Sequence, residues 1–391
     1  MKNRNILTSG VCVLIVFLSN FFVPSQINGF PKSINLSFKN CWENPHAELV
    51  FESRYQNSEF RRRPFVLEFQ NWTHKTFNLP YQFSFNLINF VGLFLLFLIL
   101  PKLSKTISRK SNSGFILQLS FLFSLPILCA FYGSIFTYDD IVQYLLLSIF
   151  LIFLFKENHI VSALFFLLAC IARETSLIYL LLVFFYLYNQ NKLNYIKIIV
   201  WIMPLILYFT FIYFYLNEST LSASKAFLFE KRFSAWKTNF QDFKTLRETS
   251  TIMFVMLGFP SYFVINRIRK TQFSEGVFWS KFSLMFLSLN LIVVLISGLV
   301  RESRLLFVPL CFILPLVVQQ LEKFSISLKK RFRQIDLKKE IIILFISALI
   351  SFVWYSPSVV GTGYIFKMYV FVYLILFLEL FYPSYLAHEN T

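Results

Sequence analysis

The feature that most constrains this chain is the repetition of apolar runs of up to about 20 residues, the length that a helix needs to cross a bilayer. Polar segments separate these runs, so the predicted fold is an all-α, polytopic transmembrane bundle of about 12 spans, within a range of 10 to 13. Residues 1–391 would form a single integral membrane domain. The expected spans lie near 6–23, 83–101, 115–133, 140–155, 160–172, 175–188, 196–216, 251–266, 277–298, 305–319, 340–355 and 368–383.

Composition excludes the main soluble classes. Hydrophobic residues make up 57% of the chain and charged residues only 15%, whereas soluble domains carry roughly 25% charged residues. The sequence contains no GxGxxG, P-loop or HExxH motif, and its five cysteines form no CxxC pair. Nucleotide-driven transport, dinucleotide chemistry, a zinc knuckle and a disulfide framework therefore have no local support.

Two stretches leave alternatives open. Lys2 and Arg4 before an apolar run also fit a secretory signal, but the run of about 18 residues is long for a signal core and no clear cleavage site follows. We therefore take it as the first span. Arg173 and Glu174 interrupt a longer apolar stretch, and we favour two short helices over one long helix because charges in mid-bilayer cost several kcal/mol.

The basic residues indicate an orientation. With the N-terminus inside, the inner connections hold 20 of the 37 Lys and Arg residues, including the dense runs 102–110 and 329–333. This distribution satisfies the positive-inside rule, so a nucleic-acid partner is not needed to explain the formal charge of +17. The charge distribution predicts a multi-pass chain with a cytoplasmic N-terminus. Richness in Phe, Ile, Asn and Lys suggests an AT-rich bacterial genome, so the predicted location is a bacterial inner membrane.

This orientation places two long polar loops outside. The first covers residues 24–82, and the second covers 217–250, with an amphipathic helix expected over 225–237. The first loop contains Glu52, Arg54, Tyr55, Arg62 and Arg63. Arginine binds phosphate oxygens in a bidentate fork, and a carboxylate can take a proton from a hydroxyl or hold a divalent cation. The alternative is a solvated loop whose arginines bind lipid headgroups.

Two short outer connections add charges near the expected helix ends. Asp139 and Asp140 precede a span, where they are candidates for substrate or metal binding or for helix capping. Arg173 and Glu174 join two short spans, where Arg173 would contact phosphate or the pair would tie the two helices together.

A late connection contains Arg301, Glu302 and Arg304, just before another span. These residues are candidates for phosphate or substrate binding. The alternative is that the arginines anchor the helix at the membrane interface by snorkelling.

Together these motifs resemble the GT-C superfamily of membrane glycosyltransferases, which use polyprenyl-phosphate-linked sugars. The matching segments are 61–65 (Arg-Arg-Arg-Pro-Phe), 138–140 (Tyr-Asp-Asp), 172–175 (Ala-Arg-Glu-Thr) and 302–304 (Glu-Ser-Arg). The likeness covers most of the chain in layout, and each motif is short.

The resemblance implies sugar transfer on the outer face of the membrane to a glycan, lipid or protein acceptor. It implies an acidic residue of the first outer loop as catalytic base or metal ligand, for which Glu52 is the best positional match. The candidate catalytic residues are thus Glu52, Asp139 and Asp140, with magnesium or manganese on Glu52 and Asp139 if a metal is used.

Three other functions are also compatible with the sequence. A polymerase or ligase of lipid-linked oligosaccharides would use outer arginines in a similar way, although usually with one dominant loop late in the chain. A transporter or flippase would perform no covalent chemistry, but it often shows internal repeats and helices broken by glycine, which is scarce here. A structural membrane subunit would have no active site at all.

Overall fold

The computed structural model describes residues 2–22, 45–56, 63–108, 113–131, 139–190, 194–217, 235–270, 274–300, 303–331, 337–356 and 363–381. Every regular element within these ranges is a helix, which confirms the all-α class for the described part of the chain. Five of the helices are long and apolar enough to cross a membrane, and they support a membrane-embedded protein. These five segments are Tyr81–Ser108, Tyr195–Tyr215, Phe243–Arg269, Val277–Ser297 and Leu310–Leu328.

Helix is found in each of the twelve expected apolar segments, but among the described residues two segments are broken and two change helix type. The segment 175–188 begins as the 3-10 helix η2 (Glu174–Ile178) and continues as α11 (Tyr179–Asn189). The segment 115–133 is broken between α6 (Ser113–Leu122) and α7 (Leu125–Leu128). The segment 305–319 is broken between α17 (Arg304–Phe307) and α18 (Leu310–Arg331). Pro309 lies in the second break, where proline disfavours the helical conformation of the residue before it. Pro126 lies in the first turn of α7, where its missing N–H is tolerated. The segment 340–355 changes from α19 (Leu337–Ala348) to the π-helical turn η4 (Leu349–Trp354).

The chain divides into two compact units. Unit 1 comprises the helices from α1 to α12 together with the segment Phe307–Leu316. Besides α6 and α7, the described helices of unit 1 are α1 (Lys2–Phe22), α2 (Pro45–Gln56), α4 (Pro64–Phe77), α5 (Tyr81–Ser108), α9 (Asp140–Phe155), α10 (His159–Ala172), the 3-10 helix η2 (Glu174–Ile178), α11 (Tyr179–Asn189) and α12 (Tyr195–Asn217).

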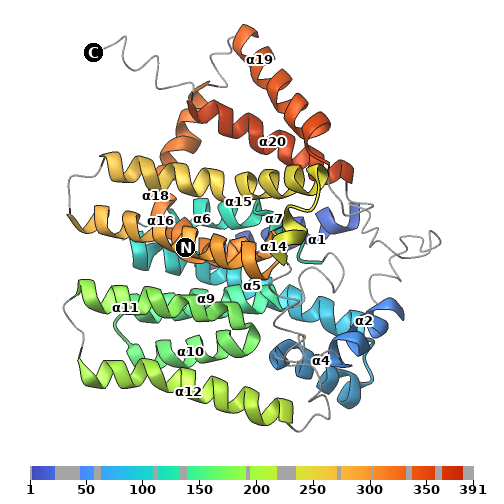
Figure 1. The fold of residues 1–391 in the computed structure, drawn as a ribbon, viewed down its shortest axis with the longest axis vertical. Helices are drawn as coiled ribbons and strands as arrows, with labels where there is room; N and C mark the ends of the chain where they lie inside the picture. The colour runs from blue at the N-terminus through green and yellow to red at the C-terminus, as the bar shows by residue number, and fades with distance from the viewer. Residues whose placement is uncertain are drawn as a thin grey trace. The chain divides into compact units, whose positions relative to one another are not determined.

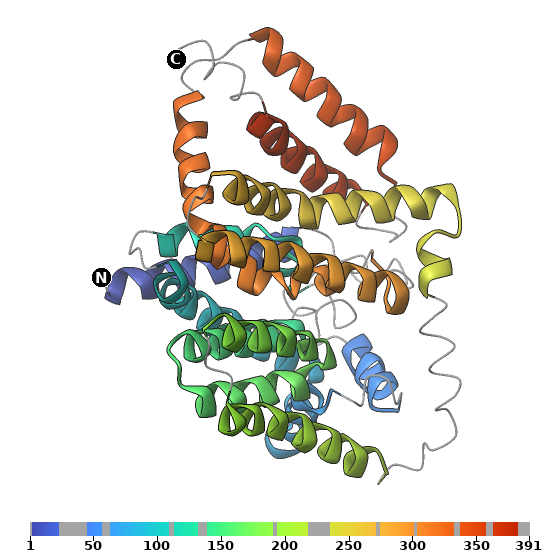
Figure 2. The ribbon, with the colours of Figure 1, turned by 60° about the vertical axis from the view of Figure 1, so that its left-hand side comes forward.

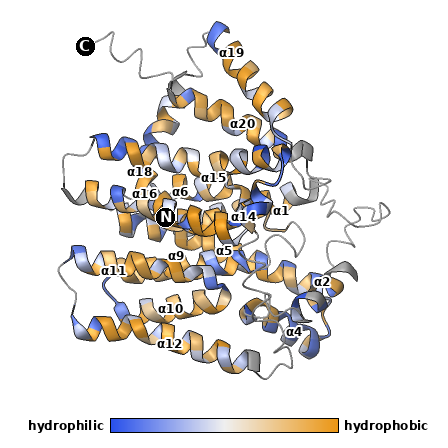
Figure 3. Ribbon diagram, viewed as in Figure 1, coloured by the Kyte–Doolittle hydropathy of each residue, from blue (hydrophilic) through white to orange (hydrophobic). Residues whose placement is uncertain are grey.

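The core of unit 1 forms where α9 packs against α5 on one side and α10 on the other, with α12 next to α10 (Figure 1). Leu96 and Leu100 of α5, Phe150 of α9 and Phe166 of α10 are fully buried there. Figure 3 shows the strong hydrophobic character of α9 to α12 and the more hydrophilic character of α2 and α4. The first expected outer loop, 24–82, therefore contains two short helices ahead of α5.

Unit 2 contains α14 (Ala235–Asn239), α15 (Phe243–Lys270), α16 (Ser274–Ser297) and the chain from Val317 onward, in which α20 (Gly363–Phe381) is the last described helix. Helices α15 and α16 lie side by side, as Figure 2 shows. Helix α15 begins at Phe243, so it includes the last part of the second expected outer loop, 217–250. The amphipathic helix expected over 225–237 lies outside the described residues up to 234, and residues 235–237 begin α14.

Helix α20 joins α15 at a local break of the α15 backbone. The Tyr373 hydroxyl accepts a hydrogen bond from the Phe259 N–H at 2.9 Å and donates one to the Phe254 carbonyl at 3.2 Å. This insertion lies next to Pro260, which has no N–H and disturbs a helix interior. A Cβ at Gly258 would lie 2.8 Å from the Tyr373 hydroxyl, so glycine permits the close approach of the two helices.

Candidate functional site

The described side chains of unit 1 include one cluster of buried charges, drawn from three segments that are far apart in the sequence. The first segment is the start of α4, where Arg63 immediately precedes Pro64 at the first helical position. Two hydrogen bonds hold α4 in place: Tyr215 donates to the Glu68 carboxylate, and Thr73 donates to Ser84 at 2.8 Å. These bonds connect α4 to α12 and α5.

Arg63 makes a bidentate pair with Glu174. Its Nε and Nη2 atoms donate to Glu174 Oε2 and Oε1, each at 2.8 Å. Arg63 Nε also lies 3.5 Å from Asp139 Oδ2. Paired, charge-assisted hydrogen bonds of this kind are among the strongest polar contacts in proteins.

Asp139 and Asp140 lie at the start of α9. Asp139 occupies the N-cap position, but its side chain makes no capping hydrogen bond, so the capping role suggested by the sequence is wrong for this residue. Its Oδ1 and Oδ2 atoms instead lie 3.6 Å from Arg173 Nη1 and 3.5 Å from Arg63 Nε. Asp140 pairs with Arg173 and lies in the first helical turn, where a negative charge complements the helix dipole.

Arg173 and Glu174 lie at a break between helices. Helix α10 ends at Ala172, Arg173 has extended backbone, and η2 begins at Glu174. The two short helices expected here are therefore present. Arg173 pairs with the start of α9 and Glu174 with Arg63, so these ion pairs do not tie the two short helices to each other.

The cluster has a buried interior and a more accessible rim. The side chains of Asp139, Asp140 and Arg173 are each 1% exposed, while Arg63 is 14% and Glu174 20% exposed. Burial alone would raise the pKa of the Glu174 carboxyl, but the Arg63 guanidinium, with help from Arg173, holds that pKa well below its usual range. A depressed pKa keeps Glu174 ionised as the pH falls, so the stability that its pair contributes is lost only in strong acid.

Gln143 extends the cluster along α9. It lies one helical turn after Asp139 and Asp140 and is fully buried. Its Nε2 atom donates to the hydroxyls of Thr175 and Ser176, both at 2.8 Å. Ser176 donates its only hydroxyl proton to the Ala169 carbonyl, so it must accept from Gln143, and this fixes the orientation of the amide.

The Gln143 Oε1 atom therefore points away from these hydroxyls. It is a buried acceptor with no hydrogen-bond partner in the described part of the chain. A buried acceptor without a donor costs about 1–3 kcal/mol, so this position suits a hydroxyl or another hydrogen-bond donor from a bound molecule. Gln143 belongs to none of the motifs identified from the sequence. Its place one turn after two aspartates, inside an apolar span, is a signal that could have identified it.

Glu52 and Arg54, two other predicted site residues of unit 1, lie on α2 and not in the segments that form this cluster. Glu52 is exposed on α2, and no hydrogen bond or ion pair joins it to the cluster among the described residues. Arg54 is buried on the same helix, where Tyr55 stacks on Phe51. Arg304 is buried at the start of α17 in unit 2. Three further candidates lie outside the described residues: Arg62, Arg301 and Glu302.

A resident metal finds little support in the described residues. They contain no group of three or more His, Cys, Asp or Glu side chains placed to hold an ion. A magnesium or manganese ion bound by both Glu52 and Asp139 would need these two carboxylates to lie close together. No described contact joins them. The donor set of the cluster instead combines carboxylates with guanidinium groups, which neutralise them directly.

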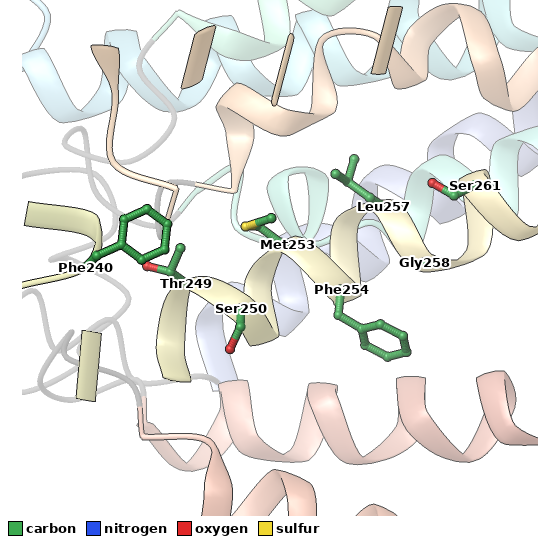
Figure 4. Close-up of a pocket in the computed structure, with 8 residues that line it drawn as sticks. All are labelled: Phe240, Thr249, Ser250, Met253, Phe254, Leu257, Gly258 and Ser261. Carbon is green, nitrogen blue, oxygen red and sulfur yellow. The ribbon is translucent and has the colours of Figure 1, made fainter. Parts of the chain in front are cut away.

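A concave region lies along α15 in unit 2. It is a cavity of about 450 Å³ lined mainly by apolar side chains and a few small hydroxyls. Figure 4 shows these residues along α15, with Phe240 contributed from just before it. No ionisable side chain is among the described residues of its lining, so it offers no acid–base chemistry.

Comparison with protein-family models, with curated proteins and with solved structures finds no match to this chain.

Proposed function

We propose that this protein is a membrane glycosyltransferase of the GT-C type. It would move a sugar from a polyprenyl-phosphate-linked donor to a glycan, lipid or protein acceptor. The observation that carries the proposal is the convergence of Arg63, Asp139, Asp140, Arg173 and Glu174 from three distant segments into one buried cluster with an accessible rim. Intramembrane or membrane-edge charges of this kind have function as their default interpretation.

Asp139 is the proposed catalytic base. Its Oδ2 and Oδ1 atoms lie 3.5 Å from Arg63 Nε and 3.6 Å from Arg173 Nη1, which is longer than a hydrogen bond, whereas Glu174 accepts two hydrogen bonds at 2.8 Å. The five groups also carry one more carboxylate than guanidinium. One carboxylate of the cluster is therefore in surplus, and Asp139 has longer ion-pair distances than Glu174.

Arg63 is the proposed contact for the donor phosphate. It belongs to the accessible rim, and its fork can exchange a Glu174 oxygen for a phosphate oxygen without changing geometry. Arg173 is more deeply buried and pairs with Asp140. These contacts favour a positioning role for Arg173, in place of the phosphate contact expected from the sequence.

The proposed reaction is a single displacement with inversion. The acceptor hydroxyl oxygen forms a bond to the anomeric carbon, and the bond from that carbon to the phosphate oxygen breaks. The hydroxyl proton passes to Asp139, and the electron pair leaves with the polyprenyl phosphate. Arg63 stabilises the charge that develops on this phosphate. Gln143 Oε1 would accept a hydrogen bond from a sugar hydroxyl and so orient the ring.

The proposal also includes a membrane location and a topology. We place the protein in a bacterial inner membrane, with about twelve spans, a cytoplasmic N-terminus and the cluster toward the outer face. The five long apolar helices and the excess of basic residues in the expected inner connections support this arrangement. No divalent cation is part of the proposed mechanism.

Photo-crosslinking tests whether the cluster holds the donor. The probe is a polyprenyl-phosphate sugar with a diazirine on the isoprene unit next to the phosphate, and a diazirine polyprenol without phosphate is the control. We expect labelled peptides to contain Arg63, residues 139–143 or residues 173–176, and excess unlabelled donor should suppress the labelling. Labelling that is confined to unit 2, or that excess donor does not reduce, would overturn the proposal.

A further inference from the structure

A cavity of about 520 Å³ lies at the end of unit 1 where α9 finishes and where α10 and α12 begin. Its walls come from residues 156–160 and 194–200, and they include Lys156, His159 and Lys197. This cavity is separate from the charged cluster, and the glycosyltransferase proposal does not use it.

The charge of the cavity is predominantly positive. Lys156 and Lys197 line it, and neither forms an ion pair in the described part of the chain. Glu157 is the one carboxylate among the described lining residues. A cavity with two lysines and one carboxylate is complementary to an anion.

Two helix starts strengthen this character. Asn158 caps α10 by accepting from the Val161 N–H, and Asn194 caps α12 by accepting from the Lys197 N–H at 2.9 Å. Both asparagines line the cavity. The positive ends of the α10 and α12 dipoles are therefore directed toward the same space as the lysine side chains.

An exposed apolar stripe continues from the cavity along α12. Ile196 lines the cavity and is 73% exposed, and Ile199, Met203 and Ile206 follow at 65%, 52% and 56% exposed. Their spacing of three or four residues places them on one face of the helix. Only 17% of the apolar window of α12 is buried, so much of this helix is available to lipid, and Figure 3 shows its hydrophobic character.

We infer that this cavity and stripe form a binding site for one anionic phospholipid. The phosphate and headgroup would occupy the basic cavity, and the acyl chains would lie along the stripe from Ile196 to Ile206. An isolated anion would leave the stripe unused, and a zwitterionic lipid would leave the positive charge of the cavity without a counterpart. Basic pockets beside membrane helices recognise anionic headgroups for the same physical reason.

Native mass spectrometry of the purified full-length protein tests this inference. The protein in detergent micelles is titrated with dioleoyl-phosphatidylglycerol, dioleoyl-phosphatidylcholine or inorganic phosphate. We expect phosphatidylglycerol to bind about tenfold more tightly than phosphatidylcholine. The double variant Lys156→Gln, Lys197→Gln should lose this preference.

The matched control is the double variant Lys102→Gln, Lys105→Gln, which removes two exposed lysines from the end of α5 and should keep the preference. Equal binding of the two lipids would overturn the inference, as would an equal loss of preference in the control. Displacement of phosphatidylglycerol by an equal concentration of inorganic phosphate would also contradict it, because the site would then recognise a free anion.

Discussion

Replacing Arg173 by methionine is expected to lower the free energy of unfolding by about 3–5 kcal/mol. The Arg173 side chain is 1% exposed and pairs with Asp139 and Asp140, which are equally buried. Methionine fills a similar volume but leaves two carboxylates in the interior without this guanidinium. Chemical denaturation of the purified protein in detergent measures the loss, because the transition midpoint and slope give the free energy.

A control variant and a compensating double variant test the physical reason for this loss. Arg269→Met removes an exposed arginine of α15 and should change stability by about 0.5 kcal/mol or less. Adding Asp140→Leu to Arg173→Met should restore part of the lost stability, because the carboxylate that lost its partner is also removed. If Arg173→Met were as stable as Arg269→Met, the cluster would not be held together as its geometry indicates.

The Asp139→Asn variant is expected to lose sugar transfer by a factor of about 10² to 10⁴, the range for removal of a general base. Asparagine keeps the size of the side chain and removes its ability to take a proton. The initial rate of transfer from a labelled lipid-linked sugar, measured at equal amounts of folded protein, gives the ratio to wild type.

The Glu52→Gln variant is the comparison that separates the two candidate bases. Glu52 is exposed on α2 and has no described contact with the cluster, so we expect this variant to retain transfer near the wild-type rate. The reverse pattern, with Asp139→Asn active and Glu52→Gln inactive, would assign the base to the first outer loop, as the family resemblance implies.

Local physics accounts for the parts of the fold that could be predicted from the sequence. The apolar run expected at 140–155 forms the helix Asp140–Phe155. Charged residues mark both of its ends, with Asp139 and Asp140 at the start and Lys156 just after the last residue. The break at Arg173 could also be predicted, because two charges in mid-span are costly. The interruption at Pro309 was not anticipated, since a uniformly apolar run conceals the conformational effect of one proline.

Which residues form the cluster depends on tertiary contacts, and a local sequence pattern does not encode these contacts. Arg63 and Glu174 are 111 residues apart, and sequence reasoning could place them only on the same side of the membrane. The same reasoning ranked Glu52 first because of its position in the loop, whereas packing of α4 against α5 and α12 brings Arg63 to the start of α9. For Gln143 the sequence signal is its place one turn after two aspartates, since a lone amide in an apolar run is otherwise uninformative.

The most direct test of the proposed function is product formation by the purified wild-type protein in sealed vesicles that contain a polyprenyl-phosphate donor with a labelled sugar. The proposal predicts that the label becomes covalently attached to a glycan, lipid or peptide acceptor and that polyprenyl phosphate is released. Label that crosses the membrane while the donor stays chemically unchanged would contradict it and identify a transporter. A donor that stays intact with every acceptor class offered would equally contradict the assignment of a glycosyltransferase.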